Sequence, residues 1–221
     1  MVCLCTMTHG VARVMPENAA ESAAGGAQLW LVRHARPLVA PGVCYGRLDV
    51  AADAAATRAC AQRLAQALPQ GMQVAYSTLQ RCELLAQHIR ALRPDLAYKP
   101  EARLCELDFG QWEGRAWSDI GKAALEHWVQ DFATHRPGGG ETLVEMLARV
   151  AQALQQARTQ ARRMGQPQLW ITHAGVARCV AWLQAQDYAH DHGSDGVRLP
   201  QAHEWPQQTL AWGEWQRIAL R

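Results

Sequence analysis

The sequence predicts an α/β protein, a three-layer α/β/α sandwich with a mainly parallel sheet. From Gln28 onward, short apolar runs of strand length alternate with helical patterns, which is the arrangement that builds parallel strands joined by crossover helices. Two of these runs, 28–33 and 168–172, are hydrophobic at most positions, as in strands that are covered on both faces. The 221 residues, 49% hydrophobic and 19% charged, suit one domain with a substantial core.

The first half of the predicted domain begins with the strand over 28–33. This strand leads into a loop over 35–50 that is marked by proline and glycine residues. An alanine-rich helix over about 52–68 follows and stops near Pro69, because proline cannot continue a helix. A short strand over 72–76 comes next.

A second helix begins after Ser77 or Thr78, either of which can cap it, and ends before Pro94. Its apolar positions recur on one helical face, at Leu79, Cys82, Leu85, Ile89 and Leu92. A brief extended segment near 96–99 then leads into a mixed apolar and acidic loop over 104–114.

The second half of the chain continues the alternation. An irregular helical region is expected over about 118–134, and the segment Pro137-Gly-Gly-Gly-Glu141 then breaks the chain. Thr142 can cap the longest helix, which ends near Gly165. The remaining predicted elements are a strand over 168–172, a helix over 175–186 and a last strand within 209–219.

Composition narrows the class of partner. The net charge is +2 and the 22 basic side chains are scattered, so the chain lacks the basic stripe of a nucleic-acid-binding protein. No run approaches the roughly 18 apolar residues of a membrane span. The cysteines number seven and follow no metal-binding spacing, which favours reduced thiols in a cytoplasmic protein.

The ends of the chain carry little pattern. Residues 1–27 show no sustained period, and we expect a disordered N-terminal extension before a domain over 28–221. A His-x-His pair at His190 and His192 lies in a polar stretch, where such pairs are usually solvated, so no metal is expected. The oligomeric state stays open.

Four segments carry polar residues where this topology gathers side chains at one edge of the sheet. Arg33 and His34 end the first strand, and His173 ends the strand over 168–172. Arg81 lies on the first turn of a helix, and Glu106 lies in the loop over 104–114. Because ligands bind in the crevice at the carboxyl ends of parallel strands, we expect these residues to share a site for an anionic substrate.

These motifs, in this order, resemble the histidine phosphatase (phosphoglycerate mutase-like) superfamily. Its signatures match Val-Arg-His after the first strand, Ser77-Thr-Leu-Gln-Arg81, Glu106-x-x-x-Gly-x-Trp-Glu-Gly114 and a late Thr-His-x-Gly ending at Gly175. The resemblance covers nearly the whole chain from about Gln28. It implies the fold of that superfamily and a metal-independent phosphomonoesterase that acts through a phosphohistidine intermediate on His34, without a cofactor.

The residue types support this chemistry. A neutral imidazole is a good nucleophile toward phosphorus, and His34 takes that role. Arg33 and Arg81 disfavour the protonated ring by charge repulsion, and their planar guanidinium groups bind phosphate oxygens. His173, if protonated, would stabilise charge on the transferring group. Glu106 is the candidate general acid, since the apolar residues of its loop are expected to raise its pKa, and it would later activate water.

Four residues depart from the family pattern. Ala35 and Ala174 stand where glycine is usual, which is tolerable if the backbone at Ala35 does not need a positive φ. Arg36-Pro37 replaces a commoner acidic or amide residue, which makes the entrance more basic and stiffer. None of these changes removes a chemical group that the reaction needs.

The loop from Pro41 to Asp49 bears on the substrate. It resembles the Cys-Tyr-Gly-x-x-Asp segment of alpha-ribazole phosphatases, which implies hydrolysis of alpha-ribazole 5'-phosphate in cobalamin biosynthesis. Tyr45 could stack on a base or sugar and Arg47 could contact the phosphate, although a structural glycine turn with a packed tyrosine explains the loop equally well.

Other functions stay open at this stage. One is a mutase or a broad-specificity phosphatase, although short connections argue against the phosphoglycerate mutases. A non-catalytic protein that binds a phosphorylated ligand is another, although it would have no need for a general acid.

Overall fold

The computed structural model describes residues 28–191 and 198–220, with side chains described through 186 and from 198. The extension expected over 1–27 lies outside the described residues, as do the side chains of the pair at His190 and His192. No helix in the described part is both long and apolar enough to cross a membrane.

A five-stranded sheet with the order β3-β2-β4-β1-β5 forms the middle layer. Its four strands β1 to β4 run parallel, and β5 pairs antiparallel with β1 at the edge. The strands are β1 (Gln28–Arg33), β2 (Gln73–Tyr76), β3 (Ala97–Pro100), β4 (Gln168–Thr172) and β5 (Trp215–Ala219). The mainly parallel sheet expected from the sequence is therefore confirmed, and the bounds of β1 and β4 match the two apolar runs.

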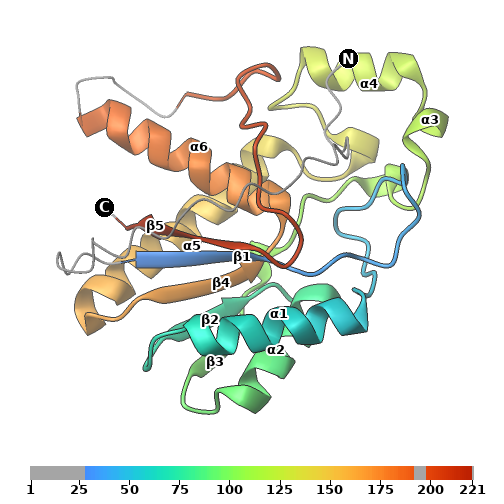
Figure 1. Cartoon of the computed structure of the whole chain (residues 1–221). Helices are drawn as coiled ribbons and strands as arrows, with labels where there is room; N and C mark the ends of the chain where they lie inside the picture. Colours follow the sequence, from blue (N-terminus) through green and yellow to red (C-terminus); the bar gives the residue numbers. More distant parts are fainter. Residues whose placement is uncertain (1–27, 192–197, 221) are drawn as a thin grey trace.

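Helices cover both faces of this sheet (Figure 1). The helices α1 and α2 lie on one face, and α5 and α6 lie on the other; the short α3 and α4 lie beyond the carboxyl ends of the parallel strands. The α-helices are α1 (Ala54–Ala67), α2 (Gln80–Leu92), α3 (Trp117–Ile120), α4 (Lys122–Gln130), α5 (Leu143–Met164) and α6 (Ala174–Asp191). Three 3₁₀ turns, η1 (Ala102–Leu104), η2 (Gly110–Trp112) and η3 (Pro137–Gly139), shape the loops.

Alternation along β1 divides the core into two clusters. Leu29 and Leu31 pack into the cluster beneath α5 and α6, while Trp30 and Val32 pack into the cluster beneath α1 and α2. Successive side chains of a strand point to opposite faces, so a strand that is apolar at every position must be covered on both. This burial holds the end of β1 rigidly.

The termini of α5 follow the predicted signals. Thr142 and Glu145 form a reciprocal capping box, in which the Thr142 hydroxyl accepts from the Glu145 N–H at 3.1 Å. Gly165 ends the helix in the left-handed conformation with φ of 63°. The helix over 175–186 is also present, although α6 extends further, to Asp191.

The predicted cap of α2 is wrong. The N-cap residue is Leu79, and no side chain of its own caps the helix. Instead, Asp49 from the 35–50 loop accepts a hydrogen bond from the Gln80 N–H at 2.7 Å. At this helix end, the Ser77 hydroxyl accepts only from the N–H of the N-cap residue Leu79, at 3.3 Å, and its contacts with the site are described below. Leu92, predicted on the apolar face, is 49% exposed because it lies on the last turn.

An aromatic cluster joins α3 and α4 to the 104–114 loop. Phe109 meets Trp117 and Trp128 edge to face at 5.6 and 5.7 Å between ring centroids. Trp112 is buried and meets Trp128 at 5.8 Å. These rings anchor the loop that carries Glu106 to the helices beyond the strand ends.

Candidate active site

Two histidines meet at the carboxyl ends of neighbouring strands. His34 follows β1 and His173 follows β4, which pair in register so that Arg33 lies opposite Thr172. The His34 N–H donates to the Thr172 carbonyl at 3.1 Å, and the ring centroids lie 5.1 Å apart. Both side chains are buried. The parallel sheet therefore brings together two imidazoles that are 139 residues apart in the sequence.

The His34 ring is oriented by its own neighbour. Its Nδ1 lies 2.6 Å from the Ala35 carbonyl oxygen, and because that oxygen can only accept, Nδ1 carries the proton. Burial lowers the pKa of the imidazole well below its ordinary value, and the charges of Arg81 and Arg33 lower it further. The ring is therefore neutral near pH 7, with its lone pair on Nε2.

Arg81 is fully buried at the centre of the site. Its Nη1 donates to the Leu48 carbonyl at 2.9 Å, and its Nη2 donates to the Gly46 carbonyl at 2.5 Å. Its Nε donates to His173 at 3.3 Å. Among the described residues, no carboxylate forms an ion pair with this guanidinium. A buried cation whose protein partners are neutral favours an anionic ligand.

His173 is held on both sides of its ring. Its Nδ1 accepts from Arg81, so in the neutral ring Nε2 carries the proton and donates to the Ser77 hydroxyl at 2.8 Å. Ser77 in turn donates to Cys105 Sγ at 3.4 Å. Burial lowers the pKa of His173 well below its ordinary value, with Arg81 as the next cause. The imidazolium considered from the sequence is therefore disfavoured by these surroundings.

Arg33 borders the site on the side of the C-terminal segment. Its Nη1 donates to the Leu210 carbonyl at 2.8 Å, and its guanidinium lies 5.3 Å from the centroid of the Trp212 ring. The Gly213 N–H reaches the carbonyls of Arg33 and His34, both at 3.1 Å. The segment before β5 therefore forms one wall of the site, a contact that no local motif indicated.

The Glu106 carboxylate lies beside the N-terminus of α6, the helix that begins directly after His173. The carboxylate accepts from the Gly175 N–H at 3.0 Å and from the Leu107 N–H at 3.2 Å. A Cβ atom at Gly175 would lie only 2.1 Å from Glu106 Oε1, so glycine is needed here for the carboxylate to approach the helix end. Backbone N–H groups at a helix N-terminus are well suited to hold an anionic side chain.

The Pro41–Asp49 loop lies against Arg81. The Arg81 guanidinium is 5.7 Å from the centroid of the half-buried Tyr45 ring, so Tyr45 borders the site. Arg47 is exposed, and its guanidinium makes no hydrogen bond or ion pair with any other described residue. The structure therefore brings Arg33, His34, Arg81, Glu106, His173 and Tyr45 together and leaves the Arg47 side chain in solvent.

Glu113 is a residue whose role was not anticipated, although it belongs to the Trp-Glu-Gly motif. Its carboxylate accepts from three consecutive backbone N–H groups, those of Gly46, Arg47 and Leu48, at 2.8, 2.8 and 3.1 Å. It also accepts from the Phe109 N–H at 2.9 Å. With its N–H groups held this way, the loop directs the carbonyls of Gly46 and Leu48 to Arg81.

The departures from the family pattern are accommodated. Ala35 is buried, and no described residue other than glycine has a positive φ, so the extra methyl group is not strained. Ala174 is the first residue of α6. Arg36 is exposed and lies 3.7 Å from Asp53, so its charge is partly balanced at the entrance.

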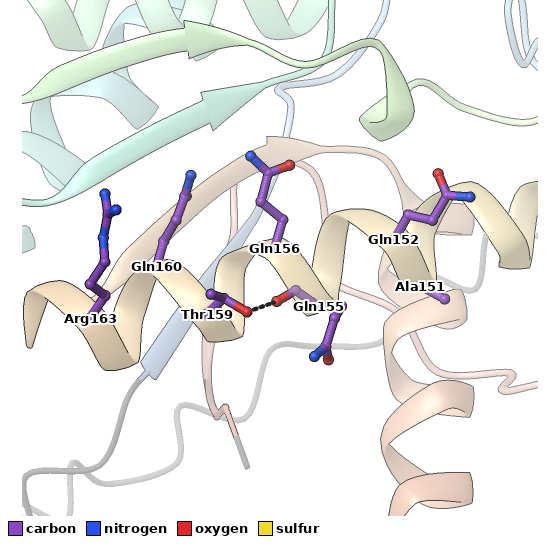
Figure 2. Close-up of a pocket in the computed structure, with 7 residues that line it drawn as sticks. All are labelled: Ala151, Gln152, Gln155, Gln156, Thr159, Gln160 and Arg163. Atoms are coloured by element: carbon purple, nitrogen blue, oxygen red, sulfur yellow. Dashed lines mark hydrogen bonds between the residues drawn. The ribbon is translucent and has the colours of Figure 1, made fainter.

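The outer surface of α5 lines a shallow pocket away from the histidines (Figure 2). Side chains four and three positions apart, those of Gln156, Gln160 and Arg163, point to the same side of the helix. The Thr159 hydroxyl donates to the Gln155 carbonyl at 3.0 Å. None of the candidate catalytic residues lines this pocket. Among the described residues, no group of three or more His, Cys, Asp or Glu is arranged to hold a metal ion.

Comparisons with known proteins agree with this geometry. The model of the histidine phosphatase superfamily (branch 1) matches residues 29–193. No curated protein matches the sequence.

Similar solved structures include the mycobacterial glucosyl-3-phosphoglycerate phosphatase, 20% identical, with a TM-score of 0.70 over 87% of this chain and 89% of that one. An Escherichia coli protein proposed to be an alpha-ribazole-5'-P phosphatase is 23% identical, with a TM-score of 0.68 over 87% and 90% of the two chains. A Thermus thermophilus protein, TTHB049, is 30% identical, with a TM-score of 0.54 over 69% of this chain and 82% of that one.

Proposed function

The chain belongs to the histidine phosphatase superfamily, and on that premise we propose that it is a metal-independent phosphomonoesterase acting through a phosphohistidine on His34. The observation that carries this proposal is the buried Arg81 guanidinium beside two neutral imidazoles, with no carboxylate partner among the described residues. A phosphate dianion is the ligand that supplies the missing negative charge.

In the first step, His34 Nε2 attacks the phosphorus atom of the monoester. A bond forms between Nε2 and phosphorus while the bond from phosphorus to the ester oxygen breaks. Glu106, in its protonated form, gives its proton to the departing oxygen, which leaves as an alcohol. Arg33 and Arg81 bind the oxygens of the transferring group.

In the second step, water attacks the phosphohistidine. The Glu106 carboxylate takes a proton from the water as its oxygen bonds to phosphorus, and the phosphorus–nitrogen bond breaks. Inorganic phosphate leaves, and the neutral His34 and protonated Glu106 are restored. The negative charge of bound phosphate favours a proton on His173, which would then stabilise the transferring group.

For the substrate, we propose a phosphomonoester with a ring in its leaving group, such as alpha-ribazole 5'-phosphate. The position of Tyr45 against Arg81 supports this choice, because an aromatic side chain beside the phosphate site offers a surface for a base or sugar. Five described cysteines are free and buried, which supports the cytoplasmic location expected from the sequence.

The test is a phosphate-release screen over phosphomonoesters that include alpha-ribazole 5'-phosphate, with and without a chelator. We expect hydrolysis that the chelator leaves unchanged and that the His34→Ala variant lacks. Conversion of 3-phosphoglycerate to 2-phosphoglycerate without phosphate release would instead show a mutase. Tight binding of phosphate esters without turnover would show a binding protein.

A further inference from the structure

Arg149 of α5 lies beneath the loop that carries Glu106, and its side chain is only 15% exposed. A guanidinium has five N–H donors in a fixed planar arrangement. Two of them hold Glu141 in a bidentate pair, with Nε to Oε1 at 2.6 Å and Nη2 to Oε2 at 2.8 Å. The Glu141 side chain is buried to a similar extent, at 12% exposed.

The remaining three donors reach the backbone of a single turn. Nη1 donates to the carbonyls of Arg103 and Cys105, both at 2.7 Å, and Nη2 donates to the carbonyl of Glu106 at 3.3 Å. All five donors of Arg149 are therefore used, and three of them converge on the turn that ends at Glu106. The Gly175 N–H then holds the carboxylate of the same residue.

The glycine-rich segment before α5 brings Glu141 to this turn. The Glu141 N–H donates to the Asp108 carbonyl at 2.9 Å. A Cβ atom at Gly138 would lie 2.1 Å from the Phe109 carbonyl, and one at Gly140 would lie 2.2 Å from the Asp108 carbonyl. Only glycine permits this close approach of two backbones, which accounts for Gly138 and Gly140, while Gly139 between them has a φ of 77° that favours glycine.

We propose that Arg149 and Glu141 are a positioning pair for the general acid, so that the pair sets where the Glu106 carboxyl meets the leaving-group oxygen. This inference rests on the proposed function, since it assigns support to the acid in that reaction. Lysine cannot replace Arg149, because an ammonium group has three donors around one point and cannot hold Glu141 and three carbonyls together.

The leaving group distinguishes a positioning role from a structural one. Nitrophenolate departs without being protonated, whereas an alkoxide needs the proton of the acid. A displaced Glu106 therefore slows hydrolysis of an alkyl phosphomonoester much more than hydrolysis of p-nitrophenyl phosphate. General loss of folded protein would lower both rates equally.

The experiment compares kcat/KM for p-nitrophenyl phosphate and for an alkyl phosphomonoester in Arg149→Lys and Glu141→Gln, with Glu106→Gln as the benchmark. We expect both pair variants to lose about tenfold to a hundredfold on the alkyl ester and less than about threefold on the nitrophenyl ester. The matched control is Arg93→Lys, since the Arg93 guanidinium also forms a bidentate pair, with Asp95 at 2.8 Å in both contacts, and donates to the carbonyls of Ala65, Leu68 and Pro69 rather than to the turn of Glu106. It should change either rate by less than about threefold.

The benchmark is informative when Glu106→Gln loses activity mainly on the alkyl ester. In that case, equal losses on the two esters, or no loss in either pair variant, would overturn the positioning role. A benchmark that loses both activities equally would remove Glu106 as the acid, and the pair's proposed role with it. Phosphohistidine formation on His34 is measured separately, so the assignment of His34 as the nucleophile is tested independently of the assignment of Glu106 as the acid. Thermal unfolding of each variant shows that the compared samples are folded.

Discussion

The ends of β1 and β4 present two similar histidines in different surroundings. The ring of His34 is held by the carbonyl of the next residue, Ala35, which leaves its Nε2 for the substrate. The ring of His173 is held by Arg81 of α2 and by Ser77, which follows β2, and both its nitrogens are engaged. In the proposed reaction, a local contact thus prepares the nucleophile, whereas a network across the fold prepares a group that responds to bound charge.

The largest expected effect comes from removing the first histidine. His34→Ala should lower kcat by about four orders of magnitude or more, because no other described imidazole in the site has a nitrogen left for attack on phosphorus. Steady-state phosphate release measures this. His203, which is exposed and is not one of the candidate site residues, provides the control, and His203→Ala should match the wild type. Turnover that survives in His34→Ala would contradict the assignment of His34 as the nucleophile, and with it the proposed difference in role between the two histidines.

Removing the second histidine should cost less. His173→Gln loses the group proposed to stabilise charge but leaves the nucleophile, so we expect kcat to fall by about a hundredfold to a thousandfold. Single-turnover kinetics should show that formation of the phosphoenzyme is slower. If His173→Gln is as inactive as His34→Ala and forms no phosphoenzyme, the assigned roles are wrong.

A third change tests the network around Arg81 through the loop that binds it. Glu113→Gln replaces a carboxylate that accepts four backbone N–H groups with an amide that can accept at only one oxygen. We expect a loss of about 1–3 kcal/mol in the free energy of unfolding and a rise in KM. Urea denaturation and initial rates measure the two quantities.

The control for this change is Glu126→Gln. Among the described residues, Glu126 pairs only with Lys122, on an exposed helical face, and its loss should change stability by less than about 0.5 kcal/mol. An unchanged KM in Glu113→Gln would show that the loop held by Glu113 does not contribute to binding of the phosphate group.

The last comparison concerns pH. The pKa values of both histidines are lowered by folding, so the unfolded chain binds their protons at a higher pH than the folded chain does. The stability that depends on the neutral rings is complete above a pH of about 6.5 and is lost as pH falls below it, by at most about 1.4 kcal/mol per pH unit for each ring. Urea denaturation from about pH 8 to pH 5 measures this slope.

Replacing either buried histidine with glutamine should make the slope shallower, while His203→Gln should leave it unchanged. A slope that is the same in all variants would show that the two rings bind their protons at the same pH in the folded and in the unfolded chain.

Sequence patterns predict the parts of this structure that depend on near neighbours. The bounds of β1 and β4 followed from apolar runs, and the cap at Thr142 followed from its place directly after the glycine-rich break, because each signal lies within a few residues. The gathering of Arg33, His34, Arg81, Glu106 and His173 also followed, since parallel strands place their carboxyl ends at one edge.

What could not be predicted depends on pairs that are distant in the chain. Ser77 was expected to cap α2, but its hydroxyl binds His173, 96 residues away, and Asp49 occupies the helix end instead. Glu113 meets the Gly46–Leu48 backbone across 65 to 67 residues. No local pattern encodes which distant backbone group a carboxylate will meet, because that choice is made by the packed fold.

The most direct test of the central claim is to trap the covalent intermediate during turnover and locate the phosphate. The account predicts an acid-labile, base-stable phosphate on His34, absent in His34→Ala and still on residue 34 in His173→Gln. Phosphate on His173, on another residue, or in an acid-stable form would contradict it.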